Sequence, residues 1–140
     1  MSQSYDSQNI FARILRGELP CHKVYEDAHA LAFMDIHPRC EGHVLVIPKA
    51  PARNIFDVSA ADLAAMMPAL RTVAQAARTA FAADGLTLHQ ANEGPGGQEV
   101  FHLHFHLMPR HKGMPLRPPA SAMEKPEVLA AHAERIRAAL

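Results

Sequence analysis

The sequence predicts an α+β fold: a single, mostly antiparallel five-stranded sheet with a long helix packed on one face and a further helix at the C-terminal end. Strand-like segments follow one another across short connections, and such connections favour antiparallel pairing. One long amphipathic stretch separates the early strands from the late ones. The chain has 140 residues, of which 49% are hydrophobic, a size that suits one domain with its own core. These observations predict a single domain over residues 1–140.

The first fifty residues are expected to form a short helix and three strands. Residues 9–16 carry an asparagine suited to capping and apolar residues on one face, and Gly17 follows as a stop signal. A turn is expected at Asp27-Ala28, between two strand-like segments. The next segment is almost continuously apolar, which is typical of a central strand buried on both faces. The predicted strands cover residues 22–26, 30–35 and 43–47.

The second part of the chain is expected to form the long helix, two strands and a last helix. A capping-box-like start at Ser59 opens the long helix, Pro68 is expected to kink it, and Gly85 to end it. A glycine-rich loop joins the two strands that follow, and a proline-rich irregular segment precedes the last helix. These elements are a strand over residues 86–92, a loop over 93–97, a strand over 101–110 and a helix that begins at Pro126.

Charge and cysteine content exclude several classes of protein. The formal net charge is zero, so no basic field favours a nucleic acid as partner. Two cysteines without a Cys-x-x-Cys pair give neither a disulfide framework nor a cysteine-type zinc signature. The stretch Met1–Asp6 lacks the basic start and apolar core of a signal peptide, and no apolar run is long enough for a membrane span. We therefore expect a cytoplasmic protein with no membrane partner.

Histidines occupy alternate positions of the last predicted strand, at His102, His104 and His106. Because alternate side chains of a strand share one face, the three imidazoles are expected to form one row. Imidazole is the side chain best suited to act as nucleophile, acid or base near neutral pH. The apolar residues around them are expected to anchor the opposite face in the core: Phe101, Leu103, Phe105 and Leu107.

Two kinds of chemistry suit such a row. One is metal binding. The strand from His102 to His106 spans about 13 Å, whereas zinc binds each nitrogen at about 2.1 Å, so three rings on one strand do not easily converge on one ion. A metal site would need two of them and a ligand from elsewhere, such as His43. In the alternative, the central histidine attacks an electrophile while its neighbours orient it and move protons. The glycine-rich loop and Gln98 would offer N–H donors to an anionic phosphate. We favour the second reading and expect neither a metal nor a cofactor.

The segment Gly97–Leu107 resembles the His-x-His-x-His-x-x signature of the histidine triad (HIT) family. Matches to the Hint branch of this family run from about residue 9 to 112, which predicts a HIT-like core over 9–112, followed by a proline-rich segment and helix over 113–140. The other matching segments are Ile10-Phe11 with Ile14, residues 17–20, 23–27, 32–36, 42–49 and 92–94.

The resemblance implies a homodimer that binds a purine nucleoside monophosphate (AMP-like) and hydrolyses nucleoside phosphoramidates or adenylylated amines at the α-phosphorus. It implies that His104 is the nucleophile and forms a nucleotidyl-histidine, that His102 orients it, and that His106 contacts phosphate oxygens and assists proton transfer. His43 would be the fourth histidine of the site. The implied nucleotide-binding residues are Asp35 for the ribose hydroxyls, Phe33 and Ile36 for the base, and Asn92, Gly97, Gln98 and Val100 near the ribose and phosphate.

Two positions depart from the family pattern. Pro51 stands where many relatives carry a histidine, and Ala12 stands at one place of a cysteine pair that holds structural zinc in some bacterial relatives. From the residues alone, Asp35 and Asn92 are better explained as turn residues. Three alternatives remain: a dinucleoside polyphosphate hydrolase, a non-catalytic purine-nucleotide-binding protein, and a histidine-based metalloprotein.

Overall fold

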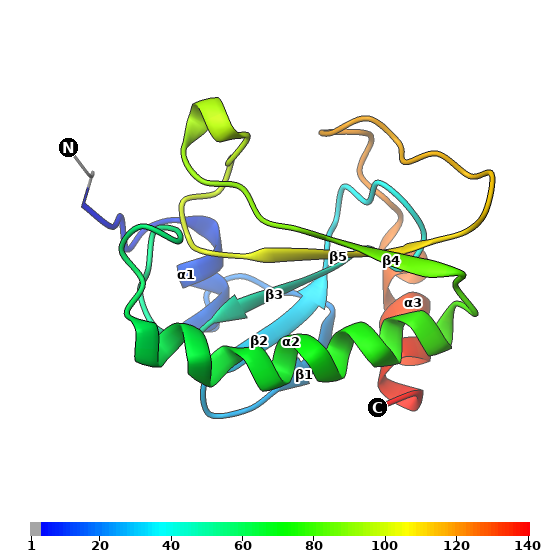
Figure 1. Cartoon of the computed structure of the whole chain (residues 1–140), viewed down its shortest axis with the longest axis horizontal. Coiled ribbons are helices and arrows are strands. Elements are labelled where there is room, and N and C mark those ends of the chain that lie inside the picture. The colour runs from blue at the N-terminus through cyan, green and yellow to red at the C-terminus, as the bar shows by residue number, and fades with distance from the viewer. Residues whose placement is uncertain (1–3) are drawn as a thin grey trace.

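Five antiparallel strands form one sheet, in the spatial order β1-β2-β3-β5-β4 (Figure 1). The computed structural model describes residues 4–140; Met1–Gln3, part of the stretch expected to lack a signal peptide, lie outside the described residues. The predicted α+β class with one antiparallel sheet is confirmed. The strands are β1 (Lys23–Glu26), β2 (Ala30–Met34), β3 (Val44–Pro48), β4 (Gly85–His89) and β5 (Phe105–Arg110).

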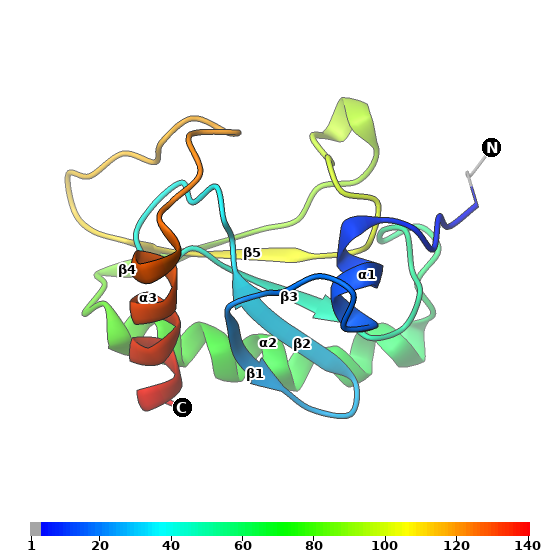
Figure 2. The same ribbon diagram turned by 180° about the vertical axis from the view of Figure 1, so that it is seen from behind.

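Helices cover both faces of the sheet. α2 runs across one face in Figure 1, α3 packs beside it and against β1 and β2, and α1 lies in front of the opposite face in Figure 2. No helix within residues 4–140 is both long and apolar enough to cross a membrane. The helices are α1 (Ile10–Leu15), α2 (Ala60–Ala80) and α3 (Pro126–Ala138), with a 3-10 turn, η1, at Gly94–Gly96.

Capping side chains set the starts of α1 and α2, as predicted. The Asn9 side chain accepts the backbone N–H of Ala12 at 2.9 Å, and the Ser59 hydroxyl accepts that of Asp62 at 3.0 Å. Gly17 follows α1 in the left-handed region, with φ +78°, where a side chain would be strained. The local sequence is therefore sufficient to place these helix ends.

The end of α2 differs from the prediction. The helix continues through Pro68 but ends at Ala80 rather than at Gly85. Gly85 is already paired with Arg110 in the sheet, so the chain must leave the helix earlier. It does so through Ala82, which takes a left-handed conformation with φ 47° while the two N–H groups after the cap return to carbonyls of the last turn. This is a Schellman ending built without glycine.

Both late strands are shorter than predicted. β4 ends at His89 rather than at Asn92, whose side chain bonds to a neighbouring loop. β5 begins at Phe105, because the N–H of Leu103 is taken by the carbonyl of Ala52 outside the sheet, at 2.9 Å. Only the second half of the histidine segment therefore belongs to a strand.

The sheet is apolar on both faces. On the side of α2, Leu103 and Leu107 are buried in the larger core and Phe105 packs against it, as predicted. The prediction that Phe101 helps to anchor this core is wrong: the ring is partly exposed, and the Arg53 guanidinium lies over it, 4.1 Å from the ring centroid. The opposite face carries a smaller cluster of Phe11, Leu31, Phe33, Leu45 and Ile47. His104 lies beside this second cluster, against the ring of Phe11.

A candidate active site of four histidines

His104 presents a free nitrogen lone pair. Its ring Nδ1 lies 2.7 Å from the backbone carbonyl oxygen of His102. Because a carbonyl oxygen only accepts hydrogen bonds, Nδ1 carries the proton and Nε2 of the neutral ring keeps its lone pair. Phe11 of α1 holds the ring edge-on, with centroids 5.1 Å apart. This arrangement suits a nucleophile that attacks through Nε2.

The ring of His102 bonds to groups outside the predicted row. It is fully buried, with Nε2 lying 2.8 Å from the carbonyl oxygen of Pro48 and Nδ1 lying 2.6 Å from the hydroxyl of Tyr5. Nε2 must donate to the carbonyl, so Nδ1 accepts from the tyrosine. The prediction of one imidazole row along a strand is therefore wrong, since His102 precedes β5 and contacts His104 through its backbone carbonyl.

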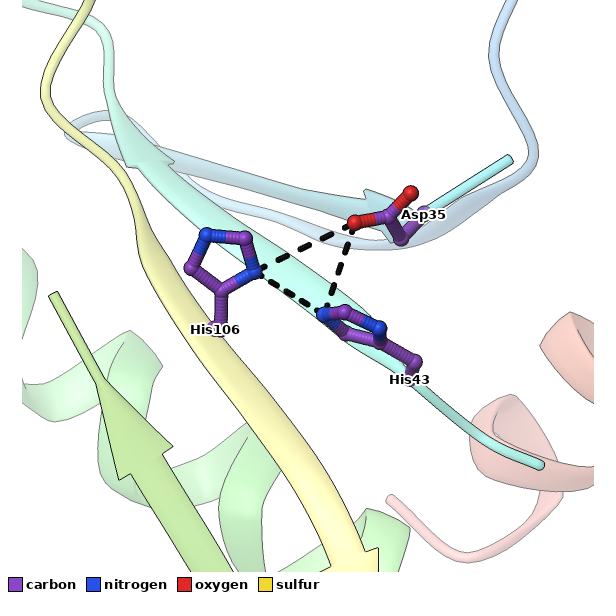
Figure 3. Close-up of side chains that lie close together, drawn as sticks. All are labelled: Asp35, His43 and His106. Atoms are coloured by element: carbon purple, nitrogen blue, oxygen red, sulfur yellow. Dashed lines mark hydrogen bonds and ion pairs between the residues drawn. The ribbon is translucent and has the colours of Figure 1, made fainter. Parts of the chain in front are cut away.

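Asp35, His43 and His106 point toward one another (Figure 3). Nε2 of His43 lies 2.9 Å from Nδ1 of His106 and 3.4 Å from Oδ2 of Asp35. The backbone N–H of Arg39 donates to Nδ1 of His43 at 3.0 Å, so the neutral ring carries its proton on Nε2. His43 donates that proton to His106, which then holds its own proton on Nε2. The three side chains form a path for protons that ends at Nε2 of His106.

The same three side chains are a possible metal-ligand group within the described residues, since one ligand atom of each lies within 4.8 Å of the others. Zinc requires a nitrogen lone pair at about 2.1 Å. Nε2 of His43 carries a proton as long as the N–H of Arg39 occupies Nδ1, and so offers no lone pair to a metal. The hydrogen bonding therefore fits a proton path better than a metal site.

Burial sets the charge state of the site. Burial lowers the pKa of His43 and of His106 to about 3 and that of His102 to about 4, and it also lowers the pKa of His104. Burial raises the pKa of Asp35 to about 6. The contact between Asp35 and His43 is therefore not an ion pair near neutral pH, because the imidazole is uncharged.

Acid should destabilise the folded protein because of these buried histidines. Unfolded histidine has a pKa of about 6.5, so between roughly pH 3 and 6.5 the unfolded chain binds more protons than the folded one, and stability falls as the pH falls. At pH 5, each of His43, His102 and His106 lowers the free energy of unfolding by about 2 kcal/mol relative to pH 7. The raised pKa of Asp35 acts in the opposite direction and adds back about 1 kcal/mol. Thermal unfolding at pH 7 and pH 5 should show a Tm at least about 5 °C lower in acid. An equal or higher Tm at pH 5 would contradict the neutral, buried state of these rings.

The residues predicted to form the base pocket differ in exposure. Phe33 is buried and lies edge-on to Phe11, with centroids 5.3 Å apart, in the cluster against which Val100 packs. Ile36 lies just beyond β2 and is 44% exposed. An accessible apolar side chain thus stands next to Asp35, while Phe33 belongs to the core beneath.

The glycine-rich loop is braced by Gln98. Its side-chain amide donates to the carbonyls of Arg53 and Val100, at 2.7 and 3.0 Å, and its oxygen accepts from the N–H of Glu93 and from Asn54, at 2.8 and 3.1 Å. Every polar atom of this side chain is therefore engaged within the protein. Gln98 holds the loop in place, and a direct bond from it to a phosphate would require one of these bonds to break.

Three backbone N–H groups of the loop are also bonded internally. The N–H groups of Gly96, Gly97 and Gln98 all donate to carbonyls of the loop itself. The Asn92 side chain accepts from the backbone of Ile55 at 2.9 Å. The tight turn, with Gly97 at φ +98°, therefore uses the N–H groups of Gly96, Gly97 and Gln98, and none of these three is free for a phosphate in this conformation.

Tertiary contacts bring in residues that sequence reasoning missed. Tyr5 bonds to His102, and Arg53 binds the carboxylate of Glu93 through two nitrogens at 2.8 and 2.9 Å. Asn54 donates to the same carboxylate. None of these residues belongs to a recognisable local motif, because their partners are far away in the sequence.

Comparison with known proteins places the chain in a family. A family model described as HIT domain matches residues 16–113. A 13.2 kDa HIT-like protein of Azospirillum brasilense is 48% identical over 109 residues, which cover 76% of this chain and 89% of that protein. Adenosine 5'-monophosphoramidase HNT1 of Saccharomyces cerevisiae is 36% identical over 105 residues, which cover 75% of this chain and 64% of that protein.

The fold agrees with these sequence matches. The crystal structure of a Hit-like protein from Bartonella henselae is similar to this one with a TM-score of 0.92 and 44% identity, covering 98% of this chain and 100% of that chain. The matched region of the family model includes His43 and the whole histidine segment. The resemblance inferred from the histidine segment is therefore confirmed, and the chain belongs to the HIT domain family.

Proposed function

We propose that this protein hydrolyses the bond between an amine and the α-phosphorus of a purine nucleoside monophosphate, through a nucleotidyl-histidine intermediate. The observation that carries the proposal is the tautomer of His104, whose Nδ1–H is held by the carbonyl of His102 so that Nε2 is free to attack. The name of the yeast relative, adenosine 5'-monophosphoramidase, supports this class of substrate.

In the first half-reaction, the lone pair of His104 Nε2 forms a bond to phosphorus and the bond from phosphorus to the amine nitrogen breaks. The leaving nitrogen keeps that electron pair and takes the proton on Nε2 of His106. His106 takes the Nε2 proton of His43 in turn, and His43 takes the carboxyl proton of Asp35. The raised pKa of Asp35 provides a protonated fraction near neutral pH.

In the second half-reaction, a water oxygen forms a bond to phosphorus and the bond to His104 breaks, returning the lone pair to Nε2. The water gives a proton to Nε2 of His106, and the protons on His106 and His43 move back one place, which restores the carboxyl group of Asp35. The products are the nucleoside monophosphate and the free amine, and the enzyme returns to its starting state.

The nucleotide would lie along the face that carries α1, and the base would contact the exposed apolar surface next to Asp35. In line with the family resemblance, we propose that the protein acts in the cytoplasm as a homodimer. The residues proposed to surround the nucleotide are Phe33, Asp35, Ile36, Asn92, Gly97, Gln98 and Val100.

Steady-state hydrolysis of a fluorogenic adenosine 5'-phosphoramidate by the full-length protein tests this function. We expect turnover with release of AMP. Binding of AMP without turnover would overturn the proposal in favour of a non-catalytic nucleotide-binding protein. Turnover of diadenosine polyphosphates at a higher kcat/KM than the phosphoramidate would overturn the assignment of substrate class.

Removal of metal ions should leave this activity unchanged. The nucleophile, the proton donor and its supply are all side chains of the chain itself, and a proton occupies the nitrogen of His43 that a metal would need. After dialysis against EDTA, kcat should stay within about twofold of its value before dialysis. Loss of turnover on dialysis, restored by zinc, would contradict the covalent-histidine mechanism.

A further inference from the structure

Tyr5 reaches into the site from the segment before α1. Its hydroxyl lies 2.6 Å from Nδ1 of His102, and the two rings meet edge-on with centroids 5.6 Å apart. His102 is fully buried, so water does not replace this partner in the folded protein. The tyrosine satisfies a buried ring nitrogen that otherwise has no hydrogen-bond donor.

The direction of this hydrogen bond is fixed by the rest of the site. Nε2 of His102 donates to the carbonyl of Pro48, so Nδ1 is an acceptor and the Tyr5 hydroxyl is the donor. Burial raises the pKa of Tyr5, which keeps the hydroxyl protonated. With both ring nitrogens engaged, the His102 side chain has a single orientation, and the backbone carbonyl of the same residue accepts the Nδ1 proton of His104.

The segment that carries Tyr5 is itself anchored. The backbone N–H of Asn9 donates to the carbonyl of Asp6 at 3.2 Å, and the Arg16 side chain donates to the carbonyl of Ser7 at 2.7 Å. The helix that follows places Phe11 edge-on against His104. Residues 5–11 therefore contact both His102 and His104, and the hydrogen bond between these two histidines sets the tautomer of the proposed nucleophile.

We propose that Tyr5 is a positioning residue of the nucleotidyl-transfer reaction: its hydroxyl holds His102 so that the His102 carbonyl keeps the proton of His104 on Nδ1 and leaves Nε2 free. This role rests on the proposed function, because it acts through the proposed nucleophile. Without the hydroxyl, the buried Nδ1 of His102 must find another donor, the residue moves, and the proton of His104 spreads over both of its nitrogens.

Tyr5→Phe tests this role, with Tyr25→Phe as the matched control. These are the two tyrosines of the chain, and the Tyr25 hydroxyl contacts the Asp27 carboxylate at 3.2 Å, at the turn between β1 and β2. Tyr5→Phe should lower kcat about tenfold and leave KM within about twofold, whereas Tyr25→Phe should change neither. Activity of Tyr5→Phe equal to wild type, or lost only in proportion to the unfolded fraction, would overturn the proposal.

Nitrogen-15 NMR of the imidazole rings provides a readout that does not depend on turnover. Wild-type His104 should show a protonated Nδ1 and an unprotonated Nε2, and Tyr5→Phe should show a mixture of the two tautomers. An unchanged tautomer in Tyr5→Phe would overturn the positioning role even if activity fell. If the wild type lacked turnover, the proposed function would fail, and the NMR comparison would still decide whether Tyr5 sets the tautomer of His104.

Discussion

Replacing His104 by alanine is expected to lower kcat/KM for an adenosine phosphoramidate by about 10⁴-fold or more. The side chain supplies the lone pair that forms the bond to phosphorus, and no other imidazole of the four-histidine site is arranged to replace it. Nδ1 of His106 accepts from His43, and both ring nitrogens of His102 are engaged. Nucleotide binding should persist, so isothermal titration with AMP should give a Kd within about threefold of wild type.

The covalent intermediate can be observed directly. Rapid acid-free quenching of wild type during turnover, followed by mass spectrometry of the digested protein, should reveal one nucleotidyl group on the peptide that carries His104. His104→Ala should show none. His29→Ala is the matched control, because His29 is exposed at the turn between β1 and β2 and should retain full activity. A nucleotidyl group on a different histidine, or turnover by His104→Ala, would assign the nucleophile elsewhere.

Substitution of His43 should slow the reaction most for substrates with poor leaving groups. In His43→Asn, the asparagine oxygen can still accept the N–H of Arg39, but no N–H reaches His106. The proton supply to His106 is then cut, and kcat/KM should fall about 10²- to 10³-fold for an alkylamine leaving group. An acidic phenol needs little protonation as it leaves, so kcat/KM for a nucleotide ester of such a phenol should fall less than about fivefold.

His43→Gln provides the matched comparison for this prediction. The glutamine amide reaches farther and restores a donor near Nδ1 of His106. With the alkylamine substrate, kcat/KM of His43→Gln should therefore be at least about tenfold higher than that of His43→Asn. His104→Ala should affect both leaving groups alike, because its role is nucleophilic. Equal losses for both leaving groups in His43→Asn would show that His43 acts in binding or folding and not in proton supply.

The sequence alone determined the fold class, the order of the elements and the residue types of the candidate site. Periodicity is a local property, so the apolar run at 43–47 predicted a strand that is buried along its whole length. The caps at Asn9 and Ser59 are equally local, and both helices begin where these side chains indicate. The alternating histidines marked the site because their spacing and chemistry are visible without any tertiary contact.

Tertiary structure decided how the histidines are used. Periodicity predicted a strand that includes His102 and His104. In the structure, the N–H of Leu103 bonds to the carbonyl of Ala52 instead, and β5 begins only at Phe105. As a result, His104 receives its tautomer from a backbone carbonyl, which no side-chain pattern encodes.

The partners that set the protonation of the site come from far along the chain. His102 bonds to Tyr5 and Pro48, and His106 bonds to His43. A sequence pattern reports spacing along one segment, whereas the proton on an imidazole is placed by whichever donor or acceptor the fold brings within about 3 Å. The residue types of the candidate site were therefore readable from the sequence. Their proposed roles depend on contacts that the sequence pattern does not show: the local carbonyl of His102 for His104, and distant partners for His102 and His106.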